Sequence, residues 1–382
     1  MVEAADGVAS CTLPAVLLFA CPPSFEGIIR GMAKKEFKHT TLYRAYRPQT
    51  FKEVRGQGHV VDVLEKAIKN KKIAHAYLFA GSRGTGKTSV ARILARALGV
   101  SDKDLYEIDA ASNTGVEHIR ELREGVHVAP FDSPYKFYII DEAHMLSKAA
   151  WNAFLKTLEE PPSHAIFVLA TTERDKIPET IQSRCEVYSF KQPTREVLAQ
   201  VIESVAKAEG YTLERSASEL VALLAEGSFR DALSILQKVL AVSDNKKIEI
   251  EEVEAVTGAP RGEVVRQILS AVAKKEAPKA LKAIRSAVEE NVDARTLAKL
   301  LIHRLRVVLL LRYAPDAADS FSHELTEGDL ALAKEISKEP GINSDTLRAF
   351  LEAYAQTAYA AVTHLPLELA VIDICDKGGK SA

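Results

Sequence analysis

The sequence predicts an α/β protein in which a parallel sheet is followed by two all-helical regions. Between about residues 38 and 190, short apolar segments alternate with amphipathic ones. A glycine-rich motif lies directly after the first apolar segment, and strand-like segments stop after Phe190. Strands that alternate with helices form parallel βαβ units, and helices then cover both faces of the sheet.

Length and composition limit the number of domains and the class of protein. The chain has 382 residues, enough for two to three domains at roughly 150 residues each. The formal net charge is -2, so no global basic field points to nucleic acid, although local basic faces stay open. Its four cysteines include no C-x-x-C pair, which argues against a disulfide framework or a cysteine zinc site and fits a reducing cytosol. No apolar run approaches the roughly 20 residues of a membrane span.

The N-terminal stretch resembles the apolar part of a secretory signal at Leu13–Cys21. The residues before it include Glu3 and Asp6 but no Lys or Arg, which is the wrong charge for such a signal. We interpret residues 1–31 as a dispensable extension, produced by a start codon assigned too early. The alternative is a genuine ordered arm.

Five segments have the short, branched or aromatic character of strands and are bounded by breakers. They are Ala76–Ala80, Leu105–Ala110, Lys136–Asp141, Ala165–Thr172 and Cys185–Phe190. A helix is expected after Gly86, because one face collects Val90, Ile93, Leu94, Ala97 and Leu98.

The later segments read as helices. Thr194 is expected to cap one that stops at Gly210, a second ends before Gly227, and Ser228–Asp231 resembles a capping box that opens a third. The segment 294–313 is apolar on nearly every side, which predicts burial in a bundle or a subunit contact. The predicted domains are an extension (1–37), a sheet domain (38–190), a small helical lid (191–243) and a helical collar for oligomerisation (244–382).

The glycine-rich motif Gly81–Thr88 matches G-x-x-x-x-G-K-[ST], between a predicted strand and a predicted helix as that motif requires. Glycines let the backbone N–H groups wrap a phosphate, and the helix N-terminus favours the negative charge. Lys87 is expected to hold the β- and γ-phosphates, and the Thr88 hydroxyl to ligate Mg²⁺. The loop residues expected to contact the nucleotide are Gly81, Ser82, Arg83, Gly84, Thr85, Gly86, Lys87, Thr88 and Ser89.

Two carboxylates, Asp141 and Glu142, end an apolar strand at the edge of the sheet where ligands bind in such folds. Asp141 is expected to hold Mg²⁺ through water, and Glu142 to polarise the attacking water. The segment Leu105–Ala110 lies between the two motifs in the chain. We therefore expect an extra strand between them in the sheet, as in ATPases that use a catalytic glutamate.

Three further side chains are expected to act on the phosphates. Thr172, ahead of Thr171, ends the next strand and would touch the γ-phosphate or the water, unless it only caps the strand. Arg184 precedes the last strand like the arginine finger of oligomeric ATPases, a contribution worth about 10³–10⁵ in rate; the alternative is a solvated charge. Arg230 lies at a helix start, where a cation opposes the dipole unless an anion such as the γ-phosphate compensates; the alternative is a pair with Glu226 or Asp231.

Taken together, these motifs resemble the gamma/tau subunits of bacterial DNA polymerase III, which are AAA+ ATPases of the clamp-loader clade. The resemblance runs from about Lys38 to Cys375 and rests on the segments Leu42–Pro48, Val54–Gln57, Ile108–Gly115, Asp141–Leu146, Leu155–Pro162, Leu169–Thr172 and Pro366–Ala370. It implies that Tyr46, Arg47, Pro48 and Val54 contribute to the adenine end of the nucleotide site.

Two departures from the family pattern stand out. Gly99–Asp104 fills the place of a four-cysteine zinc module, so zinc is not expected. The chain also stops after the helical bundle, as the short gamma form does, which puts contacts of the longer tau form with helicase and polymerase in doubt.

The resemblance implies a motor subunit that hydrolyses ATP to ADP and phosphate with Mg²⁺ and loads a sliding clamp onto primed DNA. The implied partners are delta and delta-prime subunits, further copies of the chain, the clamp and DNA, in the cytoplasm at the nucleoid and with no membrane. Polymerase activity would belong to the assembly, because the chain shows no such active site. Arg120 and Lys148 are expected to contact the DNA backbone, with solvated surface charges as the alternative.

Other readings stay open. A branch-migration ATPase would end in a winged helix, whereas this chain ends in helices, and a replication-factor-C-like small subunit would have Asn near Thr172. A structural clamp-loader subunit with little ATPase activity is disfavoured by Lys87, Thr88 and Glu142.

Overall fold

The computed structural model describes residues 41–112, 116–243, 245–314 and 327–376. Of residues 116–120 and 327 it describes the backbone but not the side chains. The predicted extension, whether taken as 1–31 or 1–37, lies outside the described residues. No helix within these ranges is long and apolar enough to cross a membrane.

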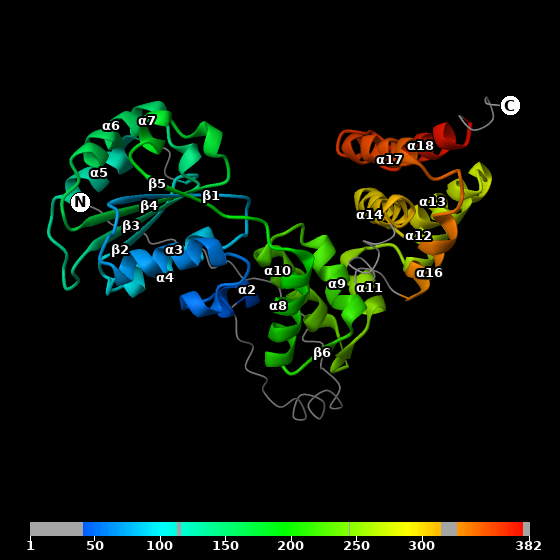
Figure 1. The fold of residues 1–382 in the computed structure, drawn as a ribbon, viewed down its shortest axis with the longest axis horizontal. Coiled ribbons are helices and arrows are strands. Elements are labelled where there is room, and N and C mark those ends of the chain that lie inside the picture. Colours follow the sequence, from blue (N-terminus) through cyan, green and yellow to red (C-terminus); the bar gives the residue numbers. More distant parts are fainter. Residues whose placement is uncertain (1–40, 113–115, 244, 315–326, 377–382) are drawn as a thin grey trace, which may run out of the picture. The chain divides into compact units, whose positions relative to one another are not determined.

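The sheet has five parallel strands in the order β2-β3-β4-β1-β5 (Figure 1). All five predicted strands are present, shortened by at most one residue at either end: β1 Ala76–Ala80, β2 Leu105–Asp109, β3 Lys136–Asp141, β4 Ala165–Thr171 and β5 Glu186–Ser189. As expected, an extra strand lies between β1 and β3, but it is β4. The expectation that Leu105–Ala110 would take this place was wrong: β2 lies at the outer edge, because the crossover helices carry the chain past neighbouring positions.

Two layers of helices cover the sheet (Figure 1), one against each face. Alternate strand residues such as Phe79 and Ile139 pack with α3 (Gly58–Lys69) and α4 (Lys87–Ala97). The intervening ones pack on the other face, with α5 (Val116–Val126), α6 (Lys148–Glu159) and α7 (Glu179–Gln182). In α4 the apolar face is buried at Val90, Ile93 and Leu94, although Ala97 is exposed, contrary to expectation. The sheet is thus buried on both faces, and its carboxyl edge is left for ligands.

The next helices are α8 (Arg195–Ala208), α9 (Arg215–Leu224) and α10 (Phe229–Val242). Thr194 caps α8 by accepting the N–H of Val197, and Ser228 caps α10 by accepting the N–H of Asp231. Strands do not stop after Phe190 as expected. Thr212–Leu213 (β6) and Lys247–Ile248 (β7) form a parallel pair, which is too short to leave an alternating pattern in the sequence.

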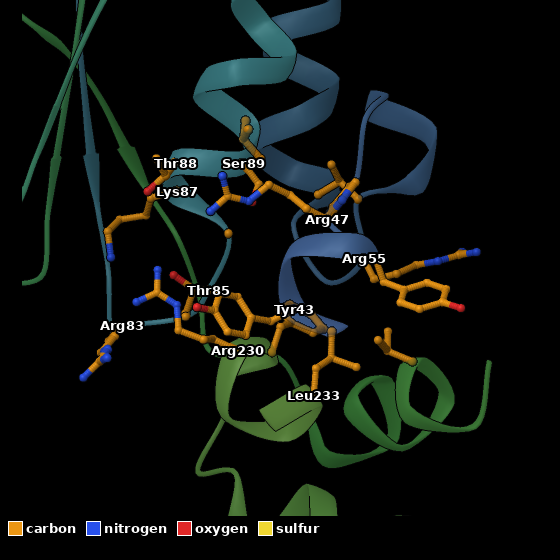
Figure 2. Close-up of a pocket in the computed structure, with 18 of the residues that line it drawn as sticks. Tyr43, Arg47, Arg55, Arg83, Thr85, Lys87, Thr88, Ser89, Arg230 and Leu233 are labelled. Atoms are coloured by element: carbon orange, nitrogen blue, oxygen red, sulfur yellow. The ribbon is translucent and has the colours of Figure 1, made fainter. Parts of the chain in front are cut away.

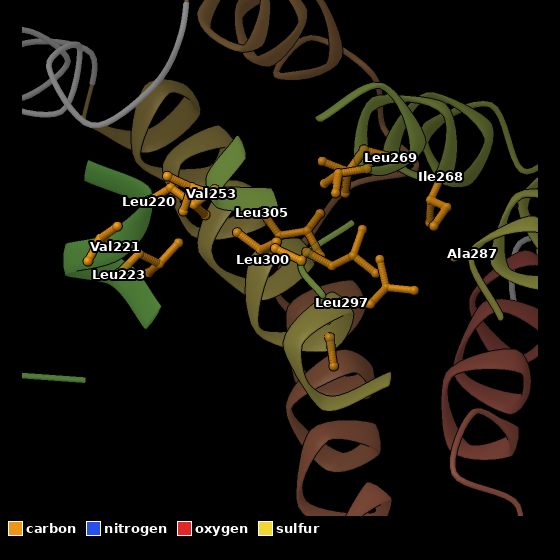
Figure 3. Close-up of a cluster of buried hydrophobic side chains, with 14 of the residues drawn as sticks. Leu220, Val221, Leu223, Val253, Ile268, Leu269, Ala287, Leu297, Leu300 and Leu305 are labelled. Carbon is orange, nitrogen blue, oxygen red and sulfur yellow. The ribbon is translucent and has the colours of Figure 1, made fainter. Parts of the chain in front are cut away.

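The C-terminal helices are α11 (Ile250–Thr257), α12 (Gly262–Ala273), α13 (Ala277–Glu289), α14 (Ala294–Tyr313), α16 (Glu327–Ile336), α17 (Ser344–Thr357) and α18 (Leu365–Asp376). As predicted, α14 is buried on several sides, for example at Leu297, Leu301 and Leu305. Its side chains share one apolar cluster with residues of α9 and α11 (Figure 3). That cluster crosses the predicted boundary between the lid and the collar; the boundaries themselves stay a prediction.

Candidate active site

The glycine-rich loop joins β1 to α4 with a backbone that other residues would adopt only under strain. Gly84 and Gly86 have φ values of 75° and 101°, and Gly86 is the N-cap of α4. A Cβ on Gly81 would come within 2.4 Å of the carbonyl oxygen of Phe190. The loop is therefore held against β5, and its N–H groups remain at the start of the helix where an anion is favoured.

Lys87 opens α4 and is buried. Its ammonium donates to the carbonyl oxygens of Gly81 at 2.8 Å and Ser82 at 2.9 Å. Burial lowers the pKa of Lys87, and the nearby carboxylates of Glu142 and Asp141 oppose that shift. A buried cation needs such partners, so a phosphate entering the loop would find a desolvated, already oriented charge.

Asp141 and Thr88 come together at the end of β3. The Thr88 hydroxyl donates to Oδ2 of Asp141 at 2.8 Å, and the Glu142 N–H donates to Oδ1 at 3.0 Å. A carboxylate and a hydroxyl oxygen side by side are ligands suited to Mg²⁺. The residues present therefore fit the metal that the sequence predicts.

Glu142 adopts a left-handed backbone conformation, with φ at 48°. Thr172, just past the end of β4, donates its hydroxyl to Oε2 of Glu142 at 3.3 Å. The two meet because β3 and β4 are neighbours in the sheet. This contact agrees with the preference for Thr172 over Thr171, because Thr171 is fully buried. The role of Thr172 with phosphate stays a prediction.

A cavity of about 420 Å³ lies in front of the loop, within the roughly 300–1,000 Å³ typical of small-molecule sites. Figure 2 shows Tyr43, Arg47, Arg230 and Leu233 around it, opposite the loop and α4. The Arg230 guanidinium lies 5.9 Å from the centre of the Tyr43 ring. The alternative partner Glu226 is instead paired with Lys299 at 2.9 Å.

Most of the predicted site residues line this cavity: Tyr46, Arg47, Pro48, Val54, Arg83, Gly84, Thr85, Gly86, Lys87, Thr88, Ser89, Asp141, Glu142 and Arg230. Gly81, Ser82 and Thr172 are not among its lining residues. Among the residues that sequence reasoning missed, Tyr43 lay inside the recognised segment Leu42–Pro48. Val201 and Leu233 carried no signal beyond helical periodicity.

Arg184 lies away from this cavity, between α7 and β5. Its guanidinium donates to the carbonyl oxygen of Thr180 and to Oε1 of Glu159, both at 2.7 Å. The adjacent Cys185 is packed, and burial raises the pKa of its thiol to about 12. In this chain Arg184 thus forms an exposed ion pair with Glu159, as the alternative of a solvated surface charge would have it. Its role as an arginine finger stays a prediction.

The two residues predicted to contact DNA are not among the described residues that line the cavity. Lys148 is the exposed first residue of α6. Arg120 lies in α5, but its side chain falls outside the described part of the chain. Both assignments remain predictions.

Comparisons with known proteins match most of the chain. The family model described as DNA polymerase III, delta subunit, matches residues 56–109 and 100–194, and the one described as DNA polymerase III clamp loader subunit, ATPase lid domain, matches residues 197–245. The DNA polymerase III subunit tau of Bacillus subtilis is 40% identical over 298 residues, covering 72% of this chain and 53% of that protein. The subunit gamma/tau of Mycobacterium tuberculosis is 36% identical over 344 residues, covering 84% of this chain and 58% of that protein.

The chain thus spans about half the length of these curated relatives. Among solved structures, the RuvB Holliday junction branch migration motor of Thermotoga maritima aligns with a TM-score of 0.49 and 23% identity. That alignment covers 59% of this chain and 79% of that one.

Proposed function

The chain is homologous to the gamma/tau subunits of bacterial DNA polymerase III over most of its length, and we propose that it is an ATP-hydrolysing motor subunit of a clamp loader. The observation that carries the proposal is the arrangement at the carboxyl edge of the sheet. There Lys87, the Thr88–Asp141 pair and Glu142 line one cavity.

ATP would bind with its phosphates along the loop 81–86 and its base toward the wall formed by Tyr43, Tyr46 and Leu233. The loop N–H groups and the buried Lys87 would hold the β- and γ-phosphates in place of the two carbonyls that Lys87 now contacts. Arg230 lines the same cavity and would approach the γ-phosphate from α10. This binding would make the position of α10 depend on the nucleotide.

Thr88 and Asp141 would hold Mg²⁺, Asp141 through water. The ion neutralises charge on the phosphate oxygens when it is bound. Glu142 would accept a proton from the attacking water and orient it. Thr172, which now donates to Glu142, lies where it could exchange that contact for the γ-phosphate or the water.

The finer roles are supported by the resemblance and by the match to the clamp loader lid domain. We propose that the chain assembles with delta and delta-prime subunits and with further copies of itself, in the cytoplasm, and loads a sliding clamp onto primed DNA. In that assembly Arg184 would complete a neighbour's site. DNA would be held through its phosphates, so binding should weaken with salt.

Steady-state ATPase measurements, with and without clamp, primed DNA and partner subunits, test the proposal. Glu142→Gln should still bind ATP and lose turnover by roughly 10²-fold or more, because the general base is gone. Glu65→Gln, an exposed carboxylate on α3, is the control and should behave like the unsubstituted protein. Turnover by Glu142→Gln at the unsubstituted rate would refute the assignment.

A further inference from the structure

A largely buried histidine lies beside the proposed catalytic glutamate. It belongs to the segment Asp141–Leu146, but the sequence analysis gave it no role. His144 belongs to the short 3-10 helix η2 (Ala143–Met145), which directly follows Glu142. Its side chain is only 8% exposed. A buried imidazole needs hydrogen-bond partners on both ring nitrogens, so its neighbours show what it can hold in place.

The partners of His144 come from the ends of two adjacent strands. Its Nδ1 lies 3.0 Å from the hydroxyl oxygen of Thr171, at the end of β4, and 3.6 Å from Oε2 of Glu142. Its Nε2 lies 3.3 Å from Oε1 of Glu173. The same Thr171 oxygen accepts the backbone N–H of Glu173 at 3.0 Å. The ring therefore has a hydrogen-bond partner at Nδ1 and a carboxylate beside Nε2, and the Glu142 carboxylate also lies near Nδ1.

The two side chains that approach Glu142 use the same carboxylate oxygen. Thr172 donates to Oε2, and Nδ1 of His144 is also near Oε2. Among the residues that the structure describes, the other oxygen, Oε1, makes no hydrogen bond. A carboxylate steadied at one oxygen and open at the other is suited to orient a water molecule. The backbone of Glu142 is in the left-handed region, a conformation that persists only where the surrounding structure holds it.

We propose that His144 is a positioning residue that holds the Glu142 carboxylate so that Oε1 faces the attacking water, with Thr171 anchoring Nδ1 of the imidazole and Glu173 lying beside Nε2. The inference rests on the proposed ATPase function. It assigns His144 no contact with nucleotide or water. Its effect is on turnover, because displacement of a reacting group by about 1 Å can cost 10²-fold in rate.

Further contacts continue from Glu173 toward Arg184, the proposed arginine finger. Lys176 pairs with Glu173 at 2.9 Å, and Gln182, two residues before Arg184, accepts from Arg174 at 3.0 Å. The segment 172–184 therefore begins at the Glu142 contact and ends at Arg184. Movement of this segment against a neighbouring subunit would reach Glu142 through Glu173 and His144.

Two substitutions test the two ring nitrogens of His144 separately. The amide nitrogen of His144→Asn replaces Nδ1, which faces Thr171 and Glu142. The amide nitrogen of His144→Gln extends farther and replaces Nε2, which faces Glu173. The full chain is assayed in the assembly in which the unsubstituted protein hydrolyses ATP, with kcat, KM, the Kd of a fluorescent ATP analogue and Tm all measured.

His144→Ala should lower kcat by about 10-fold to 10²-fold while KM and Kd stay within about twofold of the unsubstituted values. His144→Asn should recover most of the rate and His144→Gln little of it. A purely structural histidine would instead lower Tm in all variants without this order. If His144→Ala does not fold, the order of the Asn and Gln variants decides the question.

An unchanged kcat in His144→Ala, or better recovery by Gln than by Asn, would overturn the inference. These outcomes are distinct from failure of the proposed function, in which the unsubstituted protein itself would not hydrolyse ATP. Normal hydrolysis by both the unsubstituted protein and His144→Ala would remove this inference and leave the proposed function intact.

Discussion

The cavity at the glycine-rich loop contains Lys87, and the surface between α7 and β5, called the rim from here on, carries Arg184. Both side chains are basic, but their partners differ. In the cavity, Lys87 is buried and held by two main-chain carbonyls of its own loop. At the rim, Arg184 is one-third exposed and donates to the carbonyl oxygen of Thr180 as well as to the side chains of Ser183 and the half-exposed Glu159. An exposed ion pair contributes about 0–1 kcal/mol, whereas a buried cation is costly to leave unpaired.

This difference shows how each region can respond to a ligand. The cavity is lined by side chains of one chain, from the glycine-rich loop, the edge of the sheet, α2 (Leu42–Ala45) and α10. At the rim, the ion pair of Arg184 with Glu159 is exposed, so exchange of Glu159 for a neighbouring subunit's phosphate would cost little. The experiments below test whether the two regions serve separate sites in this way.

The largest effect is expected at the rim. Arg184→Ala should leave ATP binding by the isolated chain nearly unchanged and lower stimulated hydrolysis in the assembly by about 10³-fold or more, the usual worth of an arginine finger. Arg215→Ala, another exposed arginine in a surface ion pair, is the control.

Mixing separates action within a chain from action between chains. A chain with Arg184→Ala keeps its loop, and a chain with Lys87→Ala keeps its finger. Partial recovery of stimulated ATPase on mixing supports a shared site. Absence of recovery, with assembly verified by sizing, favours a plain surface charge.

The next largest effect is expected within the cavity. Lys87→Ala should weaken nucleotide binding by roughly 10²-fold to 10³-fold, because loss of one partner from a buried charged pair costs about 3–5 kcal/mol. Titration calorimetry with ATP measures the change. Lys66→Ala on the exposed face of α3 should bind normally; equal affinity of the two variants would contradict the assignment of Lys87.

A smaller effect is expected where the loop meets α10. A Cβ on Gly84 would lie 2.0 Å from the Ser228 hydroxyl, and the Gly84 carbonyl accepts the N–H of Phe229 at 3.0 Å. Gly84→Ala should lower the free energy of unfolding by about 1–3 kcal/mol and weaken ATP binding.

Gly210→Ala is the matched control, because Gly210 has a similar φ of 86° but no atom within 4 Å of a Cβ. Chemical denaturation of both variants separates backbone strain from the contact. Equal losses of stability would mean that the contact between the loop and α10 contributes nothing.

The smallest effect on ATP binding and turnover is expected outside both regions, at Asp104 before β2. Burial opposes its ionisation, but the N–H groups of Phe131, Asp132 and Ser133 donate to its carboxylate and lower its pKa to about 2. Because the folded pKa lies below the ordinary value of 3.8, the stabilisation is present above about pH 4 and lost as pH falls toward 2.

Asp104→Asn should therefore cost about 1–3 kcal/mol near neutral pH, and its difference from the unsubstituted protein should shrink between pH 4 and pH 2. Urea denaturation across this range measures it, with the exposed Asp102→Asn as control. A difference independent of pH would mean that the charge of Asp104 does not matter. ATP turnover should change little, unlike in the variants of the cavity and the rim.

The strands and the phosphate loop could be predicted from the sequence because their signals are local. An apolar run bounded by breakers marks each strand, and the G-x-x-x-x-G-K-T spacing matches one loop geometry. The caps Thr194 and Ser228 were found for the same reason, since a cap and its helix are adjacent in the chain. The family resemblance supplied Tyr46, Arg47, Pro48 and Val54, which composition and periodicity could not identify.

Other features depend on which strands and helices become neighbours. The position of β4 between β1 and β3 brings Thr172 to Glu142 and Thr171 to His144, and no local pattern encodes a strand order. Val201 and Leu233 reach the cavity only because α8 and α10 pack beside it. By itself the sequence determined the local elements and the reactive groups, since these depend on near neighbours along the chain. The tertiary structure decided which groups meet, because contacts between distant segments depend on how whole elements pack.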